Sequence, residues 1–232
     1  MNARTFWGWA VAVMMVAMLY ACAKPDRNFA PPASTEPKPE LTTPTAITAA
    51  LSKGGYLIYV RHGQTNHDEV ELEARNREMG RFSIDDCATQ RNLSAEGREE
   101  ARRTGAAYRR AGIPVARHVT SRYCRAMQTA AFYADKLELS EALTSEGAIT
   151  KSPERIAMVR ALLSERPPAG QNAMLFAHQG IFYAATNLTV QEGWAVVLEP
   201  GNFNRIIARI APRDWESIGR ARRYAVTDVW RT

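Results

Sequence analysis

Cysteine and histidine are scarce in this chain of 232 residues, which contains three cysteines and four histidines. Protein metal sites gather such residues, or carboxylates, at short and regular spacing. Neither kind of cluster occurs along the sequence. We therefore expect that no metal and no other cofactor takes part in the function.

The basic residues lack the pattern that is typical of nucleic-acid binding. The formal net charge is +6, and the main group of arginines has the spacing of a solvated helix face without regularly interleaved aromatics: Arg98, Arg102, Arg103, Arg109 and Arg110. Proteins that bind single strands combine such charges with aromatic side chains on which bases stack. We predict no nucleic-acid partner, and a basic surface that suits phosphorylated sugars, nucleotides or lipid headgroups.

The N-terminus has the composition of an export signal. Arg4 is the single charge before an apolar stretch of signal-peptide length, Phe6–Leu19. The stretch leads to Ala21-Cys22, and a small residue before a cysteine resembles the bacterial lipoprotein signal, in which the cysteine is lipidated and becomes the new N-terminus. Tyr20 departs from that pattern, so an uncleaved membrane anchor is the alternative. Both interpretations place the following domain outside the cytoplasm and attached to a membrane.

These patterns divide the chain into three parts. Residues 1–21 are predicted to be a lipoprotein signal peptide, with Cys22 as the lipidated residue. Residues 22–46 are rich in Pro, Ser, Thr and charge and cannot bury enough apolar surface to fold, so we predict a semi-extended tether. Residues 47–232 are predicted to form the globular domain. We expect this domain in the envelope of a bacterial cell, facing the periplasm or the exterior.

Lipidation of Cys22 would leave an even pair of cysteines, Cys87 and Cys124, in an oxidising compartment. An even number of cysteines in such a compartment favours a disulfide. The sequence leaves the bridge open, because it does not show whether the two Cα atoms come close enough.

Strand and helix patterns alternate along residues 47–232. Short apolar runs predict strands at Tyr56–Val60, Val115–Ser121, Ala173–Ala177, Ala195–Leu198 and Phe203–Ile210, the last two as a hairpin. Helices are predicted at Ala46–Leu51, from Ser94 to Gly112, at Tyr123–Leu137 and from Ser152 onward. The polar stretch 64–92 has no clear period and is predicted to be a loop over the site. The simplest fold that fits this alternation is α/β, a three-layer α/β/α sandwich.

Charged and polar residues follow three of the predicted strands. Arg61 and His62 come after the first, Arg125 lies in the segment after the second, and His178 follows the third. Open α/β sheets place their ligand crevices at the carboxyl ends of strands, so we expect these residues to meet there. An imidazole beside guanidinium groups can attack phosphorus while the positive charges hold the phosphate oxygens.

The three segments resemble the histidine phosphatase superfamily, in its phosphoglycerate mutase-like branch 1. The shared motifs are Arg61-His62-Gly63, the run Ser121–Ala130 that contains Arg-Ala-Met-Gln-Thr-Ala, and His178-Gln179-Gly180. They occur in the order and spacing of the family. The resemblance covers residues 54–210 and implies a phosphoglycerate mutase-like fold.

The resemblance also implies a role for each of these residues. His62 is the nucleophile and forms a transient phosphohistidine. Because it attacks through an unprotonated nitrogen, we expect its other nitrogen to donate to a backbone carbonyl. The groups expected to bind the phosphoryl oxygens are Arg61, Arg125 and His178. The groups predicted to add neutral contacts to the substrate are Gln64, Thr65, Asn66 and Gln179.

Phosphatases of this family protonate the leaving oxygen with a carboxyl group, which then activates water. In the mutase-like branch this group follows the helix that carries the Arg-Ala motif, which indicates Glu146. The alternatives are Glu141, Asp85 and Asp86. The acid phosphatase and phytase branch has His followed by Asp, whereas Gln179 follows His178 here, which argues against that branch.

One part of the long polar segment indicates a narrower group. Residues 86–94 resemble a subset of small exported members, among them those similar to lipopolysaccharide core heptose phosphate phosphatases. Within this stretch, Arg91 is predicted to reach a second anionic group on the substrate. The expected partners are therefore a phosphorylated small molecule, such as a phosphosugar or lipopolysaccharide component, and the membrane that holds the lipid anchor.

These predictions combine into a membrane-tethered phosphomonoesterase that acts through a phosphohistidine. The alternative is a lipoprotein that binds phosphate esters with little or no turnover, because the proton donor is less well marked than the phosphate-binding residues. Mutase activity is disfavoured, since a phosphoglycerate mutase acts on cytoplasmic metabolites and this chain carries an export signal.

Overall fold

A mixed sheet of seven strands runs through the part of the chain that this computed structural model describes, residues 36–144 and 152–228. The strand order is β1-β7-β6-β2-β5-β3-β4, and β6 is antiparallel to both of its neighbours while the other pairs are parallel. The strands are β1 (Pro39–Leu41), β2 (Leu57–Arg61), β3 (Val115–Thr120), β4 (Glu138–Leu139), β5 (Asn172–Ala177), β6 (Ala195–Leu198) and β7 (Ile206–Ile210). The helices are α1 (Pro44–Lys53), α2 (Val70–Glu78), α3 (Ala95–Ala111), α4 (Cys124–Ala131), α5 (Pro153–Leu162), α6 (Gln179–Thr186) and α7 (Asp214–Asp228).

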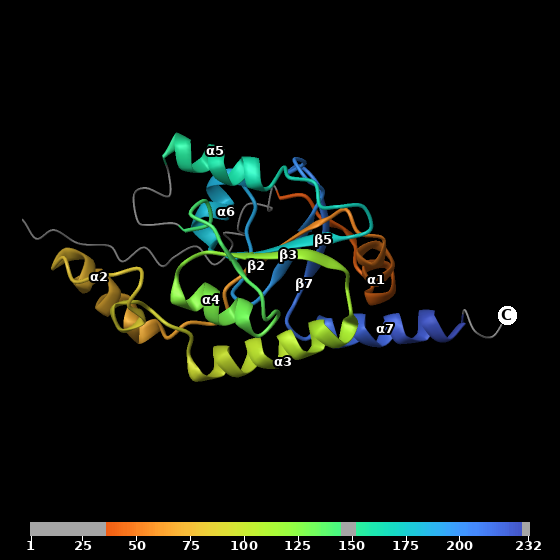
Figure 1. The fold of residues 1–232 in the computed structure, drawn as a ribbon, viewed down its shortest axis with the longest axis horizontal. Coiled ribbons are helices and arrows are strands. Elements are labelled where there is room, and N and C mark those ends of the chain that lie inside the picture. The colour runs from red at the N-terminus through yellow and green to blue at the C-terminus, as the bar shows by residue number, and fades with distance from the viewer. Residues whose placement is uncertain (1–35, 145–151, 229–232) are drawn as a thin grey trace, which may run out of the picture. The chain divides into compact units, whose positions relative to one another are not determined.

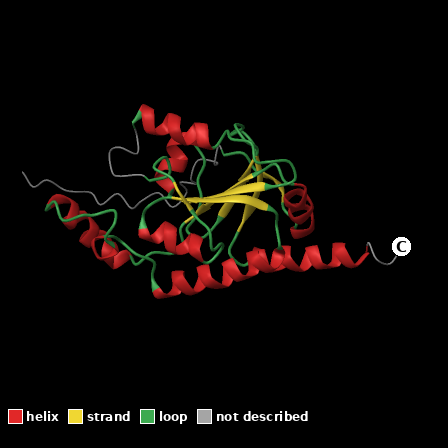
Figure 2. Ribbon diagram, in the orientation of Figure 1, coloured by secondary structure: helices red, strands yellow, loops and turns green. Residues whose placement is uncertain are grey.

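Strand β2 is buried on both faces and defines three layers. Ile58 and Val60 belong to a core cluster shared with α1, α3, α4 and α7, whereas Leu57 and Tyr59 belong to a second cluster shared with α5 and α6. The alternation follows from the two-residue period of a strand. Figures 1 and 2 show α5 and α6 on one side of the sheet and α3, α4 and α7 on the other. The predicted three-layer α/β/α sandwich is confirmed.

Local signals explain where several predicted elements begin. Ser94 Oγ accepts the Gly97 amide at 2.9 Å and caps α3. Ser152 caps α5, and Pro153 lies in its first turn, where the missing N–H has no cost. The predicted hairpin is present as β6 and β7. The helix predicted at Tyr123–Leu137 is shorter in the structure, where α4 ends at Ala131.

The end of the predicted tether belongs to the domain. Pro39–Leu41 form the edge strand β1, which pairs with β7, and α1 begins at Pro44. Proline content was misleading here, because proline is tolerated on edge strands and in the first turn of a helix. The predicted tether boundary at residue 46 is therefore wrong. The remaining part of that tether, 22–35, and the predicted signal peptide, 1–21, lie outside the described residues.

The polar stretch 64–92 contains a helix where we predicted a loop. In Figure 1 this helix, α2, lies outside the three layers. Val70 and Leu72 on α2 are exposed, so the helix has no apolar stripe and its sequence shows no helical period. It is held by its charged residues, Glu73 above all, whose contacts are described below.

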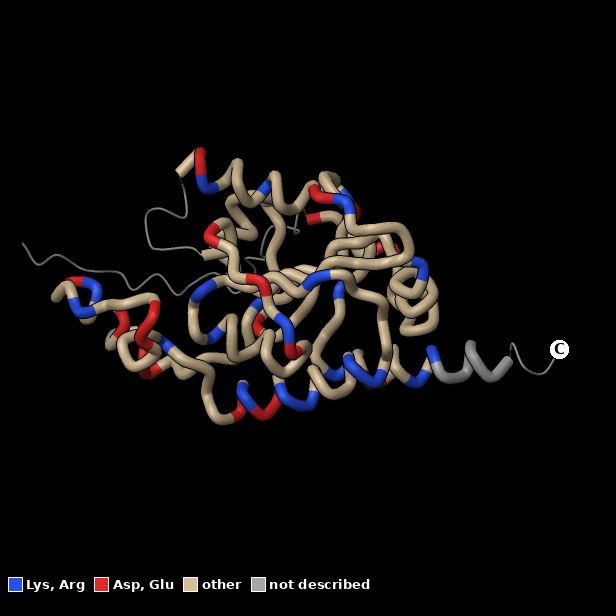
Figure 3. Tube along the Cα trace, in the orientation of Figure 1, with Lys and Arg blue, Asp and Glu red and all other residues tan. Residues whose placement is uncertain are grey.

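The arginines of α3 lie on its exposed face, as predicted (Figure 3). Acidic residues of the same helix balance part of this charge: Arg102, for example, pairs with Glu99 at 2.7 Å. Exposed pairs of this kind contribute little to stability. Among the helices of the described residues, none is both long enough and apolar enough to cross a membrane.

Candidate active site

Three neighbouring strands bring the predicted residues to one edge of the sheet. Strand β5 lies between β2 and β3, and all three are parallel, so their carboxyl ends coincide. Arg61 is the last residue of β2 and pairs in register with Ala177, which precedes His178. Arg125 lies in the first turn of α4, which follows β3. The structure therefore brings together the four residues that we call the phosphate cradle: Arg61, His62, Arg125 and His178.

His62 is buried, and one of its ring nitrogens already has a partner. Nδ1 lies 2.8 Å from the carbonyl oxygen of Gly63 and donates to it, as predicted, which leaves the lone pair on Nε2 free. Burial and the charge of Arg125 lower the pKa of His62 well below its usual value, so the ring is neutral. The Gly63 amide donates to Thr129 Oγ1 at 2.9 Å, which fixes the main chain. His62 is therefore a fixed and unprotonated base or nucleophile.

The ring of His178 lies beside that of His62, with the centroids 5.3 Å apart. Ser121 Oγ accepts the amide of Tyr123, and its own proton can be donated to His178 Nε2 at 2.9 Å. When the hydroxyl donates to Nε2, the ring proton lies on Nδ1. Burial, and after it the charge of Arg125, lower the pKa of His178 well below its usual value. His178 can therefore act as a neutral donor next to His62.

Arg125 is held by a carboxylate that sequence analysis missed. Its Nη1 donates to Glu73 Oε2 at 3.1 Å and to the carbonyl oxygen of Arg91 at 3.3 Å, and its side chain is 9% exposed. Glu73 also accepts from the Arg91 amide at 2.8 Å and from Arg77 at 3.2 Å. Burial alone would raise the pKa of Glu73, but Arg125 and these donors hold the pKa below its ordinary value. No local pattern marks Glu73, because it is one of several charged residues in the same short segment, among them Arg75 and Arg77.

Arg61 is held in the same way by Glu192. Its Nη1 donates to the carbonyl oxygen of Val190 at 3.2 Å, and its Nη2 donates to Glu192 Oε1 at 3.0 Å. Glu192 also accepts from Thr65 Oγ1 at 3.1 Å. Thr65, predicted to contact substrate, thus binds the carboxylate that orients Arg61. Glu192 is a second residue that sequence analysis missed, since it lies more than a hundred residues from its partner in the chain.

Three nitrogen atoms of the phosphate cradle lack a hydrogen-bond partner within residues 36–144 and 152–228. They are Arg61 Nε, Arg125 Nε and His178 Nδ1, and all three are buried. Most buried donors in native proteins have a partner, so an unpaired group calls for an explanation. A tetrahedral anion offers acceptors in several directions at once, and guanidinium groups bind such anions well. The cluster is therefore suited to a phosphoryl group.

The other residues predicted to contact substrate hold loops in this structure. Asn66 Oδ1 accepts a main-chain amide two residues further on, at 3.1 Å, and Gln179 Oε1 accepts the amide of Val190 at 2.6 Å. Gln64 is exposed. Its main chain passes close to Gly97, where a Cβ on residue 97 would lie 1.9 Å from the carbonyl oxygen of Gln64. Asn66 and Gln179 thus have partners within the protein.

Arg91 lies near the phosphate cradle. Its main chain binds both Glu73 and Arg125, and its side chain is half-buried. Burial and the charges of Arg125 and Arg61 lower the pKa of His62 and of His178, and the charge of Arg91 lowers both further. A third positive charge thus adds to the potential that favours an anion here.

Glu146, the predicted general acid, lies outside the described residues, as does Cys22. Of the alternatives, Glu141 and Asp85 both bind Arg122, at 2.9 and 2.6 Å, and their side chains are mostly exposed. Asp86 caps the 3₁₀ turn that follows it, with a contact of 3.0 Å. All three alternatives therefore have structural partners at the surface.

The remaining histidines lie apart from this chemistry. His67 is exposed in a 3₁₀ turn, and His118 Nε2 lies 2.8 Å from the hydroxyl of Tyr108. No group of three or more His, Cys, Asp or Glu that could hold a metal occurs in the described part of the chain.

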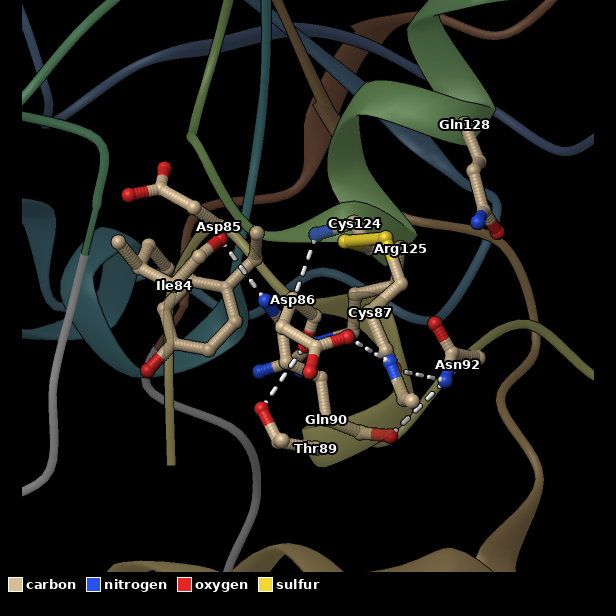
Figure 4. The surroundings of a disulfide bond; sticks show 12 residues. Ile84, Asp85, Asp86, Cys87, Thr89, Gln90, Asn92, Cys124, Arg125 and Gln128 are labelled. Carbon is tan, nitrogen blue, oxygen red and sulfur yellow. Dashed lines mark hydrogen bonds between the residues drawn. A yellow bond between two sulfur atoms is a disulfide. The ribbon is translucent and has the colours of Figure 1, made fainter. Parts of the chain in front are cut away.

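A disulfide joins Cys87 to Cys124, with the two Cα atoms 5.7 Å apart. It connects the 3₁₀ turn Cys87–Thr89 to the first residue of α4, beside Arg125 (Figure 4). Gln90 strengthens the same connection, because its Oε1 accepts the Cys124 amide at 3.0 Å. The disulfide therefore ties the polar stretch that carries Arg91 to the helix that carries Arg125.

We expect replacement of both cysteines, Cys87→Ser with Cys124→Ser, to lower the free energy of unfolding by about 4 kcal/mol, from the loop-closure entropy of a 37-residue separation. Denaturant unfolding of the variant and of the oxidised wild type measures this loss. Reduced wild type is the matched control and should unfold like the variant. Equal midpoints for all three samples would contradict the structural role given to the disulfide.

Comparison with known proteins finds a family match over part of the chain. Residues 57–147 match the family model described as the histidine phosphatase superfamily (branch 1). No curated protein matches this chain. Among solved structures, the chain is similar to the protein histidine phosphatase SixA complexed with tungstate, at 16% identity over 68% of this chain and 98% of that one, with a TM-score of 0.47. It is also similar to TTHB049 from Thermus thermophilus, at 25% identity over 67% of this chain and 99% of that one, with a TM-score of 0.43.

Proposed function

We propose that this chain is a phosphatase of branch 1 of the histidine phosphatase superfamily, whose family model matches residues 57–147, and that it hydrolyses phosphate monoesters through a phosphohistidine on Nε2 of His62. One observation carries the proposal: the ring of His62, with Nδ1 bound to the Gly63 carbonyl, belongs to a cluster in which three buried nitrogen atoms have no hydrogen-bond partner among the described residues. Phosphoryl transfer depends mainly on positioning and on charge complementary to the equatorial oxygens. The cradle supplies both.

The proposed reaction has two steps. In the first, His62 Nε2 attacks phosphorus, a P–N bond forms, the ester P–O bond breaks, and a carboxylic acid gives its proton to the leaving oxygen. In the second, water attacks phosphorus, its proton goes to the same carboxylate, and the P–N bond breaks to release inorganic phosphate. Glu73 and Glu192 keep the two guanidinium groups oriented throughout.

We propose Glu146 as that carboxylic acid. Glu146→Gln should lower kcat/KM for alkyl phosphates by about 10²-fold or more, because kcat/KM reports the first step and a poor leaving group needs the proton. The kcat/KM for aryl phosphates should fall much less. Glu141→Gln is the matched control, since Glu141 binds Arg122 and should leave both values unchanged. Equal loss of kcat/KM on alkyl and aryl esters would assign the proton to another group.

We also propose that the domain is tethered to a membrane of the bacterial envelope through lipidated Cys22, and faces the periplasm or the exterior. The support is the apolar N-terminal stretch that ends before Ala21-Cys22. Several acyl chains would anchor it firmly, since one chain alone is marginal. Mass spectrometry of the mature protein should show acylated Cys22 as the first residue. An intact Met1 would refute the lipid anchor.

The proposed substrate is a phosphorylated small molecule, with phosphosugars and lipopolysaccharide components as the first candidates. The charge of Arg91 near the cradle supports a substrate with a second anionic group. The test is a panel of such esters, given to the wild type and to His62→Ala. Hydrolysis that disappears in the variant supports the proposal. Tight binding of vanadate without turnover of any ester would instead identify a phosphate-ester-binding lipoprotein.

A further inference from the structure

The loop of residues 187–194, between α6 and β6, supplies both partners of Arg61. The carbonyl oxygen of Val190 and the carboxylate of Glu192 bind its two terminal nitrogens at 3.2 and 3.0 Å. The direction of the Arg61 guanidinium therefore depends on where this loop lies. The loop contains no helix or strand, so contacts from other elements must fix it.

Glu36 and Arg209 fasten this loop from its outer side. Glu36 Oε1 accepts the amide of Thr189 at 2.6 Å, and Glu36 Oε2 pairs with Arg209 Nη2 at 2.6 Å. Arg209 Nη1 donates to the carbonyl oxygen of Thr189 at 2.5 Å. The three residues form a closed ring that binds both polar groups of the Thr189 main chain. The side chains of Glu36 and Arg209 are only 19% and 22% exposed, so water screens these contacts less than at an open surface.

We propose that Glu36 is a positioning residue for the phosphate cradle, acting through Thr189 and Val190 on Arg61. The inference rests on the proposed function, because that function gives Arg61 its role in phosphate binding. Fixing both polar groups of Thr189 fixes the next carbonyl along the chain, which is the one that Arg61 binds. Glu36 lies within residues 22–46, the segment predicted to be the tether. A residue of that predicted tether thus contributes to the geometry of the proposed active site.

A nearby ion pair provides a matched control. Glu40 lies on β1, and its two oxygens bind Arg205 at 2.6 and 2.7 Å. This pair has the same charges as the pair of Glu36 with Arg209, although Glu40 binds its arginine through both oxygens and Glu36 through one. It does not contact the loop of residues 187–194. Glu40→Gln therefore removes a comparable ion pair from the same segment and should leave the site intact.

The test measures binding of inorganic phosphate by calorimetry with the full chain, without any substrate. Glu36→Ala should weaken phosphate binding about tenfold, a smaller loss than the roughly hundredfold that an ångström of misplacement can cause in catalysis. Glu40→Gln should bind phosphate like the wild type. Glu36→Gln keeps an acceptor for Thr189 and loses the charge, so it should give a folded protein with an intermediate loss. Thermal unfolding of each variant separates a local effect from general destabilisation.

A double-mutant cycle with Arg61→Ala shows whether Glu36 acts through Arg61. If it does, Glu36→Ala should have no further effect on phosphate binding in the Arg61→Ala protein, because coupled residues are not additive. The inference would be overturned if Glu36→Ala weakened phosphate binding equally in the wild type and in Arg61→Ala. It would also be overturned if Glu36→Ala and Glu36→Gln both bound phosphate like the wild type. Wild-type phosphate binding in Arg61→Ala would overturn the cradle itself, and with it the proposed function.

Discussion

His62→Ala should lower kcat for aryl phosphates by roughly 10⁴-fold or more, the scale seen when the nucleophile of an enzyme is removed. The reason is specific to this ring. Its Nδ1 is committed to the carbonyl oxygen of Gly63, so Nε2 is the atom left to attack. Burial and the charge of Arg125 lower the pKa of His62, so the attacking lone pair is not lost to protonation. No other described side chain offers this combination at the carboxyl ends of β2, β3 and β5.

The loss should appear in kcat on a simple aryl phosphate, measured with purified protein. His118→Gln is the matched control, since His118 pairs with Tyr108 and not with the cradle. Phosphate binding in His62→Ala should remain measurable, because Arg61, Arg125 and His178 are still present. Turnover at the wild-type rate in His62→Ala would show that another group attacks phosphorus.

Arg125→Ala should lower kcat/KM by about 10²- to 10³-fold, the range for removal of one charge-stabilising donor in a transition state. Arg125 is the more buried of the two guanidinium groups in the cradle, and its charge also acts on both histidines. Arg125→Lys should recover only part of the activity, because an ammonium group keeps the charge but lacks the planar fork. Steady-state kinetics on an aryl phosphate measures both variants.

The same substitution also tests the ion pair behind Arg125. Without Arg125, Arg77 is the one charged partner that Glu73 keeps among the described residues, so Arg125→Ala should also lower the free energy of unfolding, by roughly 3 kcal/mol. Adding Glu73→Gln should restore part of that stability and none of the activity. An active Arg125→Ala protein, or full recovery of activity in the double variant, would show that Arg125 has a purely structural role.

The cradle could be predicted from the sequence because its signals are local. A buried strand shows as an apolar run, and Arg61-His62 and His178 each follow such a run directly. Parallel strands then bring these ends together whatever lies between them in the chain. The hydrogen bond from His62 Nδ1 to a carbonyl group could be predicted too, because the chemistry of attack requires it. The bridge between Cys87 and Cys124 could be offered only as an open alternative, since spacing alone gives no distance.

The residues that hold the cradle could not be predicted, because their signals are not local. Glu73 and Glu192 are ordinary charged residues in polar segments, and they gain a role only by meeting Arg125 and Arg61 in space. Helix α2 lacks an apolar stripe, so its period is invisible in the sequence. Strand β1 was hidden by its proline content, although an edge strand tolerates proline.

The central claim is that His62 carries the phosphoryl group during turnover. The most direct measurement is intact-protein and peptide mass spectrometry of enzyme quenched in alkali during hydrolysis, because the P–N bond of a phosphohistidine is lost in acid. The account predicts one added phosphoryl group on the peptide that contains His62, and none in His62→Ala. An active wild type with no phosphoryl group on that peptide, or with the group on another residue, would contradict it.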